Sequence, residues 1–305
     1  MARPAAEARP LGTERPADAG RVTDDERATA TAPPLAHPPV LGPAQTALLR
    51  ALDAHFASWG TGAGAQEILP PPLYPVSDLQ KFDVYTNFPH LALVASPLDL
   101  TGDAPEPRDG RFAPQEVLPA TLGLPHATCY GAYLYYEGTE VADETLVTLV
   151  NRCFRREEHY DGLRRLLSFH MRETVALGGF EHTQRVLGSF AERTQELAAA
   201  LGLTMEKVPA SDPFFDSGGS RALLAKLSPV KYEFQVDGLA IASVNTHRNF
   251  FGERCDIRLS GSGDHAFTGC AAFGLERWVS VLSDLHGGDA VAALEHLRDA
   301  ARRSA

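Results

Sequence analysis

The segment Phe154–Glu173 carries the residues of this chain whose types and spacing best suit the binding of a nucleotide. Two strands of a hairpin are predicted at its ends, and Asp161-Gly162 in the intervening polar loop is a typical turn signal. Such a hairpin would place a guanidinium, a carboxylate and an aromatic ring beside one another. These groups could neutralise phosphate, accept a hydrogen bond from the adenine amino group and stack on the base. The segment therefore predicts a nucleotide site on two antiparallel strands.

The elements around this hairpin are predicted to be a mixture of helices and antiparallel strands. Apolar residues recur with helical spacing over Ala44–Trp59 and His182–Leu201, and each stretch ends at a glycine. Lys231–Val236 and Leu239–Val244 read as paired strands, because Asp-Gly between them is a second hairpin signal. Regular βαβ alternation is missing, which favours an α+β fold with an antiparallel sheet flanked by helices.

Two further stretches and three charged residues complete the local predictions. His126–Tyr133 is rich in aromatic residues that favour strands, and a sheet position is expected for Tyr133, Tyr135 and Tyr136. Cys270–Arg277 is expected to begin a helix that continues through Leu282. Three charges near the hairpin are expected to be solvated and to lie outside the site: Arg156, Glu158 and Arg172.

The composition is that of an acidic globular protein. The 305 residues are 44% hydrophobic, which is enough for a sizeable core, and the net charge of −11 argues against a large nucleic-acid surface. No apolar run approaches the roughly 20 residues that span a bilayer. The four cysteines are widely spaced and predict no disulfide framework, so a reducing, cytoplasmic location is expected. Residues 1–40 have few large apolar side chains and are expected to be a disordered tail before a folded domain over 41–305.

Three motifs in order resemble those of the class II aminoacyl-tRNA synthetases. Ala44–Pro72 is similar to their motif 1, Phe154–Glu173 to motif 2 and Phe273–Arg277 to motif 3. The resemblance implies the class II catalytic core as the fold. A narrower resemblance is to the amino acid:[carrier protein] ligases, truncated homologues of the zinc-dependent seryl-tRNA synthetases of methanogens. The shorter segments that carry it are Thr128–Tyr130, Met171–Glu173, Asp212–Phe215, Ala242–Asn245, Arg248–Gly252 and Thr268–Cys270.

The resemblance implies ATP-dependent ligation and assigns roles to individual residues. Arg155 is expected to bind the α-phosphate of ATP, where a fixed guanidinium supplies preorganised positive charge. Glu157 would accept a hydrogen bond from the adenine amino group, Phe169 would stack on adenine, and Arg277 would contact the γ-phosphate. Arg155 and Arg277 are thus the catalytic residues, and Mg²⁺ is expected to accompany ATP. Three further residues are expected to contact ATP: Arg164, Arg165 and Ser243.

The same resemblance implies a zinc site made by Cys129, Glu173 and Cys270. Their spacing alone predicts no metal site, and a free cysteine is commonly inert packing. Three protein ligands would leave a fourth position for the α-amino group of the substrate, a small amino acid such as glycine or alanine. Three residues are expected to contact this substrate: Tyr130, Ser217 and Asn245.

The acceptor that the resemblance implies is the phosphopantetheine thiol of a carrier protein. Arg221 and Lys226, within the basic stretch Gly219–Lys231, are expected to dock an acidic carrier, and an ordinary exposed helix is the alternative. A seryl-tRNA synthetase-like enzyme that charges tRNA is disfavoured by the missing tRNA-binding domain. A non-catalytic paralogue is disfavoured by the intact motif residues. A homodimer through Ala44–Pro72 is expected.

Overall fold

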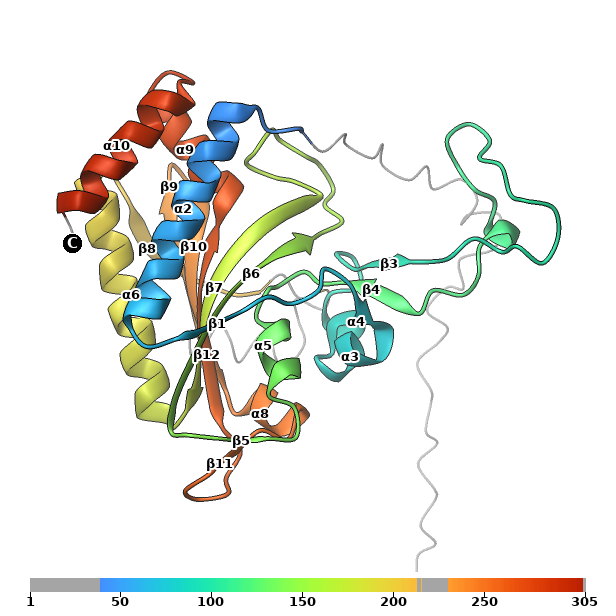
Figure 1. The fold of residues 1–305 in the computed structure, drawn as a ribbon, viewed down its shortest axis with the longest axis horizontal. Helices are drawn as coiled ribbons and strands as arrows, with labels where there is room; N and C mark the ends of the chain where they lie inside the picture. The colour runs from blue at the N-terminus through green and yellow to red at the C-terminus, as the bar shows by residue number, and fades with distance from the viewer. Residues whose placement is uncertain (1–38, 213–214, 216–229, 304–305) are drawn as a thin grey trace, which may run out of the picture. The chain divides into compact units, whose positions relative to one another are not determined.

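One seven-stranded sheet organises the described part of the chain, which comprises residues 39–212, 215 and 230–303 of a computed structural model. The strand order is β1-β6-β7-β12-β10-β9-β8, and every pairing is antiparallel except the parallel pair β1–β6 (Figure 1). This arrangement confirms the predicted α+β class. The bounds are β1 Gln66–Ile68, β6 Glu144–Phe154, β7 Ser168–Gly178, β12 Phe267–Gly274, β10 Leu239–Arg248, β9 Lys231–Val236 and β8 Glu206–Ala210.

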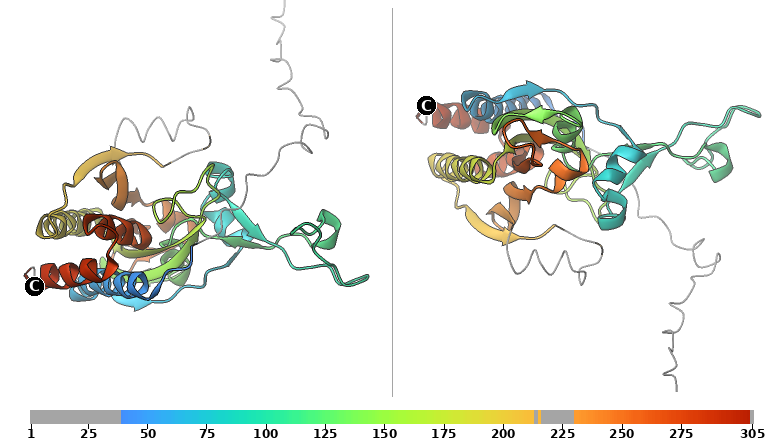
Figure 2. Two further views of the ribbon diagram at one scale, coloured as in Figure 1. Left: turned by 90° about the horizontal axis from the view of Figure 1, so that it is seen from above. Right: turned by 90° about the horizontal axis from the view of Figure 1, so that it is seen from below.

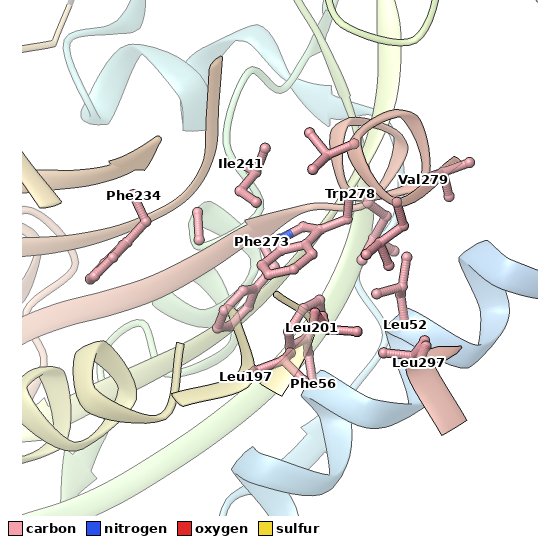
Figure 3. Close-up of a cluster of buried hydrophobic side chains, with 14 of the residues drawn as sticks. Leu52, Phe56, Leu197, Leu201, Phe234, Ile241, Phe273, Trp278, Val279 and Leu297 are labelled. Carbon is pink, nitrogen blue, oxygen red and sulfur yellow. The ribbon is translucent and has the colours of Figure 1, made fainter. Parts of the chain in front are cut away.

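Four long helices cover one face of this sheet (Figures 1 and 2). Their apolar side chains meet those of the strands in one core, in which Phe56 stacks on Phe273 with ring centroids 4.0 Å apart and Trp278 is fully buried (Figure 3). Both predicted long helices are present, because their periodic apolar residues face this core. The bounds are α2 Pro43–Gly62, α6 Phe180–Ala200, α9 Leu275–Leu285 and α10 Ala290–Arg303.

The opposite face carries shorter elements and a second apolar cluster. Two small sheets, β2-β4-β3 and β11-β5, lie outside the main sheet. No helix among the described residues is long and apolar enough to cross a membrane. The short elements are β2 Tyr74–Pro75, α3 Val76–Lys81, α4 Val84–Asn87, β3 Leu93–Ala95, the 3₁₀ helix η1 Pro114–Glu116, β4 Leu122–Leu124, α5 Tyr130–Tyr135, β5 Glu140–Val141, α8 Phe250–Arg254 and β11 Arg258–Leu259.

Both predicted hairpins form. β6 and β7 pair along their whole lengths, and the connecting loop turns at Asp161–Arg165, where Gly162 has a φ of +45°. Asp237 and Gly238, with φ values of +48° and +74°, form the two-residue turn between β9 and β10. Left-handed backbone at both central positions is the geometry that an Asp-Gly hairpin turn provides.

Three local predictions were wrong. Tyr133 and Tyr135 lie in helix α5 and Tyr136 directly follows it, so none of them is in a strand. Tyr130 and Tyr133 both stack on aromatic rings of the second cluster, a spacing of three that a helix supplies. Residues 270–274 belong to strand β12, which is bonded to neighbours on both sides, and the helix begins at Leu275. Arg172 is not solvated, since only 2% of it is exposed.

Candidate active site

The alternation of side chains along the strands concentrates functional residues on the face of the sheet away from the long helices. Ala271 and Phe273 point into the helix-side core, whereas Cys270, between strands β7 and β10, belongs to the second cluster. The pairing register places Cys270 opposite Asn245, and Asn245 opposite Lys231. Residues that are far apart in the sequence therefore lie in one row across β12, β10 and β9.

A second row runs parallel to the first, two residues along each strand. Glu173 on β7 lies opposite Ala272, Ala272 opposite Ser243, and Ser243 opposite Glu233 on β9. Because residues two apart share a face of a strand, both rows point to the same side. Together they form the floor of two adjoining cavities.

The first cavity collects the predicted ATP-binding residues. Arg165 lies beside it, with its Nη1 2.8 Å from Glu157 Oε2. The cavity holds carboxylate, guanidinium, hydroxyl and aromatic groups together, a combination that suits a nucleotide with its phosphates. The predicted residues that line it are Arg155, Glu157, Arg164, Phe169, Ser243 and Arg277.

Two arginines of this cavity are held by main-chain carbonyls. Arg155 donates from Nε and Nη2 to the carbonyl of His126, at 3.2 and 3.0 Å, and its guanidinium lies 5.1 Å from the ring centroid of Phe169. Arg277 donates to the carbonyls of Arg164 and Ala240, both at 2.8 Å. Burial, with the nearby guanidinium groups of Arg155 and Arg165, lowers the pKa of Arg277 to about 10, so it is protonated at neutral pH. Fixed positive charge thus lies where phosphate would bind.

The second cavity contains a compact set of possible metal ligands. The ligand atoms of Cys129, Glu173 and Cys270 all lie within 4.8 Å of one another, and all three residues are buried. Glu173 Oε1 accepts hydrogen bonds from the amides of Thr128 and Cys129, at 2.9 and 3.1 Å. The other oxygen, Oε2, is buried without a hydrogen-bond partner among the described residues. A cation bound here would satisfy that oxygen, and the sulfur and carboxylate donors fit Zn²⁺.

The pKa values of these ligands fit a site that exchanges protons for a metal. Burial raises the pKa of Glu173. The hydrogen bond with Cys129 and burial raise the pKa of Cys270 well above its ordinary value. For Cys129 the hydrogen bond with Cys270 acts in the opposite direction, but burial and Glu173 still raise its pKa. The metal-free set therefore favours its neutral forms, and a bound cation would displace the protons.

Two of the three predicted substrate contacts line the second cavity, and Ser217 lies outside the described residues. Asn245 donates to Ser243 Oγ at 3.2 Å and to Cys270 Sγ at 3.4 Å, so it connects the two rows. The Tyr130 hydroxyl lies 2.9 Å from His126 Nε2. The substrate pocket is therefore braced by polar contacts as well as by aromatic packing.

Sequence reasoning missed three residues of the second cavity: His126, His247 and Asp212. Burial, together with Arg155, lowers the pKa of His126 to about 3, and burial lowers that of His247 to about 4, so both rings are neutral. Asp212 belongs to a segment that carries the resemblance, which could have marked it, but no motif marks His126 or His247, because their place in the cavity depends on packing between distant segments. The pocket thus has uncharged imidazoles beside a carboxylate.

Five residues line both cavities: Arg155, Met171, Lys231, Ser243 and Ala272. Lys231 was expected to lie in an exposed carrier-docking stretch, but its side chain is only 17% exposed. Its ammonium is hydrogen-bonded to Asp212 at 3.0 Å and forms an ion pair with Glu233 at 3.2 Å. Arg221 and Lys226, the other docking residues, lie outside the described residues.

Similarity to known proteins agrees with this geometry. No protein-family model matches the chain. Amino acid–[acyl-carrier-protein] ligase 1 of Bradyrhizobium diazoefficiens is 31% identical over 275 residues, which cover 84% of this chain and 83% of that protein. The structure of M. kandleri seryl-tRNA synthetase in complex with A. aeolicus tRNASec has a TM-score of 0.68 and 22% identity, covering 85% of this chain and 56% of that chain. The structure of Pyrococcus horikoshii seryl-tRNA synthetase complexed with ATP has a TM-score of 0.60 and 15% identity, covering 80% of this chain and 52% of that chain. The chain spans about half the length of these two solved structures, which confirm the class II synthetase fold.

Proposed function

The chain belongs to the family of amino acid–[acyl-carrier-protein] ligases, and we propose that it activates a small amino acid with ATP and transfers it to the phosphopantetheine thiol of a carrier protein. The observation that carries this proposal is the junction of the two cavities. One cavity has the charge and the aromatic group for ATP, the other has a Cys-Glu-Cys donor set, and Arg155 lines both. An amino acid and an ATP bound side by side would meet at Arg155.

Adenylation at this junction needs no proton transfer. A carboxylate oxygen of the amino acid attacks the α-phosphorus, a new O–P bond forms, and the bond to the β-phosphate oxygen breaks with its electrons leaving on pyrophosphate. Arg155 would stabilise the charge on the α-phosphate, and Arg277 that on the leaving phosphates, with Mg²⁺ accompanying ATP. Glu157 and Phe169 would hold the adenine, once Arg165 releases the carboxylate with which it pairs. Glycine and alanine are the substrates that we propose.

Cys129, Glu173 and Cys270 would hold a zinc ion in the second cavity. When bound, the zinc ion would act as a Lewis acid and hold the α-amino group of the amino acid at the position that the three protein ligands leave open. Tyr130 and Asn245 line the space beside these ligands and would orient the rest of the substrate. The α-carboxylate would then face Arg155.

The second half-reaction passes the aminoacyl group to a thiol. The sulfur attacks the carbonyl carbon of the adenylate and a C–S bond forms. The C–O bond to AMP breaks with its electrons leaving on AMP, and the thiol proton is lost to water. Arg221 and Lys226 are proposed to guide an acidic carrier to the site, and the thiol would enter from the cavity that holds the amino acid. Reversing both charges is expected to slow transfer and to leave adenylation intact.

Amino-acid-dependent exchange of pyrophosphate into ATP tests the first half-reaction. A panel of amino acids should give exchange with glycine or alanine and little with large side chains. Transfer of the labelled amino acid is then measured to holo-carrier protein, to apo-carrier protein and to tRNA. Label on the holo form alone supports the proposal, whereas charged tRNA or a complete lack of exchange contradicts it.

A further inference from the structure

We propose that Lys231 is a second catalytic cation of the adenylation step, which contacts the amino acid carboxylate and the α-phosphate on the side of the junction opposite Arg155. This inference rests on the proposed function. Lys231 belongs to none of the three motifs and is not one of the predicted metal ligands.

Lys231 lies where the two cavities join. Of the five residues shared by the two cavities, the two charged ones are Arg155 and Lys231. Arg155 follows the end of β6, whereas Lys231 begins β9, and β7, β12 and β10 lie between them in the sheet. The two cations therefore reach the junction from different sides. Asn245 and Cys270 continue the row of Lys231 towards the metal ligands, so Lys231 is aligned with the expected amino acid.

The partners of Lys231 hold its ammonium in place and keep it charged. Burial alone would lower its pKa, but Asp212 and Glu233 raise it above the ordinary value. Asp212 lines the amino acid cavity and Glu233 the ATP cavity, so the ammonium lies between the two. An ammonium has three N–H donors. In the described part of the chain one donates a hydrogen bond to Asp212, and Glu233, an ion-pair partner 3.2 Å away, is close enough to occupy a second. The third donor remains for an anionic oxygen at the junction.

The reaction supplies that oxygen. Adenylation brings a carboxylate against a triphosphate, so two anions must approach within bonding distance. Because Arg277 is assigned to the leaving phosphates, Arg155 alone would leave the attacking oxygen, or an equatorial oxygen of the α-phosphate, without a protein cation on the other side of the junction. A second fixed cation lowers this repulsion most in the transition state, where the charges are closest. Lys231 meets this need without moving the sheet.

The first measurement is pyrophosphate exchange by the full-length, zinc-loaded protein with Lys231→Met. We expect kcat for exchange to fall about 10²-fold, the loss typical of one removed charge-stabilising donor, with a smaller change in KM for ATP. Lys231→Arg should recover part of the rate, because it keeps the charge with a different geometry. The matched control is Lys207→Met, an exposed lysine of the neighbouring strand β8, which should exchange at the wild-type rate. Exchange by Lys231→Met within threefold of wild type would overturn the proposal.

A purely structural role, in which Lys231 only neutralises its two carboxylates, is separated by a mutant cycle. Lys231→Met is compared in the wild-type background and in an Asp212→Asn/Glu233→Gln background. If Lys231 is a catalytic cation, Lys231→Met should lower the exchange rate by a similar factor in both backgrounds. If Lys231 only neutralises its carboxylates, the substitution should lower the rate in the wild-type background alone. Zinc content and melting temperature are measured for each variant, so that unfolding is not mistaken for lost chemistry. Wild-type exchange is established first, which keeps failure of this inference distinct from failure of the proposed function.

Discussion

At the scale of single residues, burial decides the chemical state of the predicted metal ligands. Burial raises the pKa of Glu173, and the hydrogen bond with Cys129 together with burial raises that of Cys270. For Cys129, burial and Glu173 raise the pKa against the opposing hydrogen bond with Cys270. Glu173 Oε2 is left without a hydrogen-bond partner among the described residues. An unpaired buried acceptor is costly unless a cation binds it. The same physics keeps His126 and His247 neutral. These groups of the pocket are therefore suited to coordination and hydrogen bonding.

The four free cysteines provide an internal test of the zinc proposal. Cys129→Ala and Cys270→Ala should each lose most of the zinc from the purified protein, since each removes one of three ligands. Cys153→Ala and Cys255→Ala are matched controls, because both are buried free cysteines outside the ligand set. They should retain about one zinc per chain. Metal analysis by plasma emission spectroscopy gives the ratio of zinc to protein chains. A normal zinc content in Cys129→Ala and Cys270→Ala would refute the site.

At the scale of elements, Arg172 connects the helix side of the sheet to the candidate active site. Its guanidinium donates to both carboxylate oxygens of Asp53 on α2, at 2.7 and 3.0 Å, and to Glu67 on β1 at 2.8 Å. The next residue along β7 is Glu173, which points to the other face. The segment similar to motif 1 is thus tied to the strand that carries a predicted metal ligand.

Arg172→Met is expected to lower the free energy of unfolding by about 2–3 kcal/mol. Loss of one partner of a buried pair costs about 3–5 kcal/mol, and the cost is smaller here because Glu67 remains 54% exposed to water. Arg152→Met on the adjacent strand is the control, since Arg152 is exposed and should change stability by less than about 0.5 kcal/mol. Urea unfolding followed by circular dichroism compares them. Equal effects of the two substitutions would show that the buried network does not stabilise the fold.

At the scale of the whole molecule, the segment similar to motif 1 leaves apolar surface at the first strand of the sheet. β1 pairs with β6. Leu69, the residue after β1, is 83% exposed, and Leu73, a little further along the chain, is 38% exposed. Exposed apolar side chains beside a strand edge are typical of a surface that another chain covers. This observation supports the proposal that the protein is a homodimer through Ala44–Pro72.

Sedimentation or light scattering should give the mass of two 32.9 kDa chains for the wild-type protein. Leu69→Glu is expected to shift the equilibrium towards the monomer, because it would place a charge in the apolar contact. Leu100→Glu, at a residue 71% exposed and outside the segment, should leave the mass unchanged. A wild-type monomer at micromolar concentration would contradict the proposed dimer.

The local sequence determined the hairpins and the long helices, because turn geometry and helical periodicity are short-range properties. The Asp-Gly turns and the apolar spacing of α2 and α6 were predictable for that reason. The arginines of the candidate site were predicted from the resemblance of the motifs. The resemblance implied that Cys129, Glu173 and Cys270 meet, and the tertiary structure brings their ligand atoms together. Only the tertiary structure decided that Arg172 is buried and that Lys231 lies between two cavities. Each of these depends on strand register and on packing between segments that are distant along the chain. Neighbouring residues do not encode such contacts, so a charge that reads as solvated in the sequence can be central in the fold.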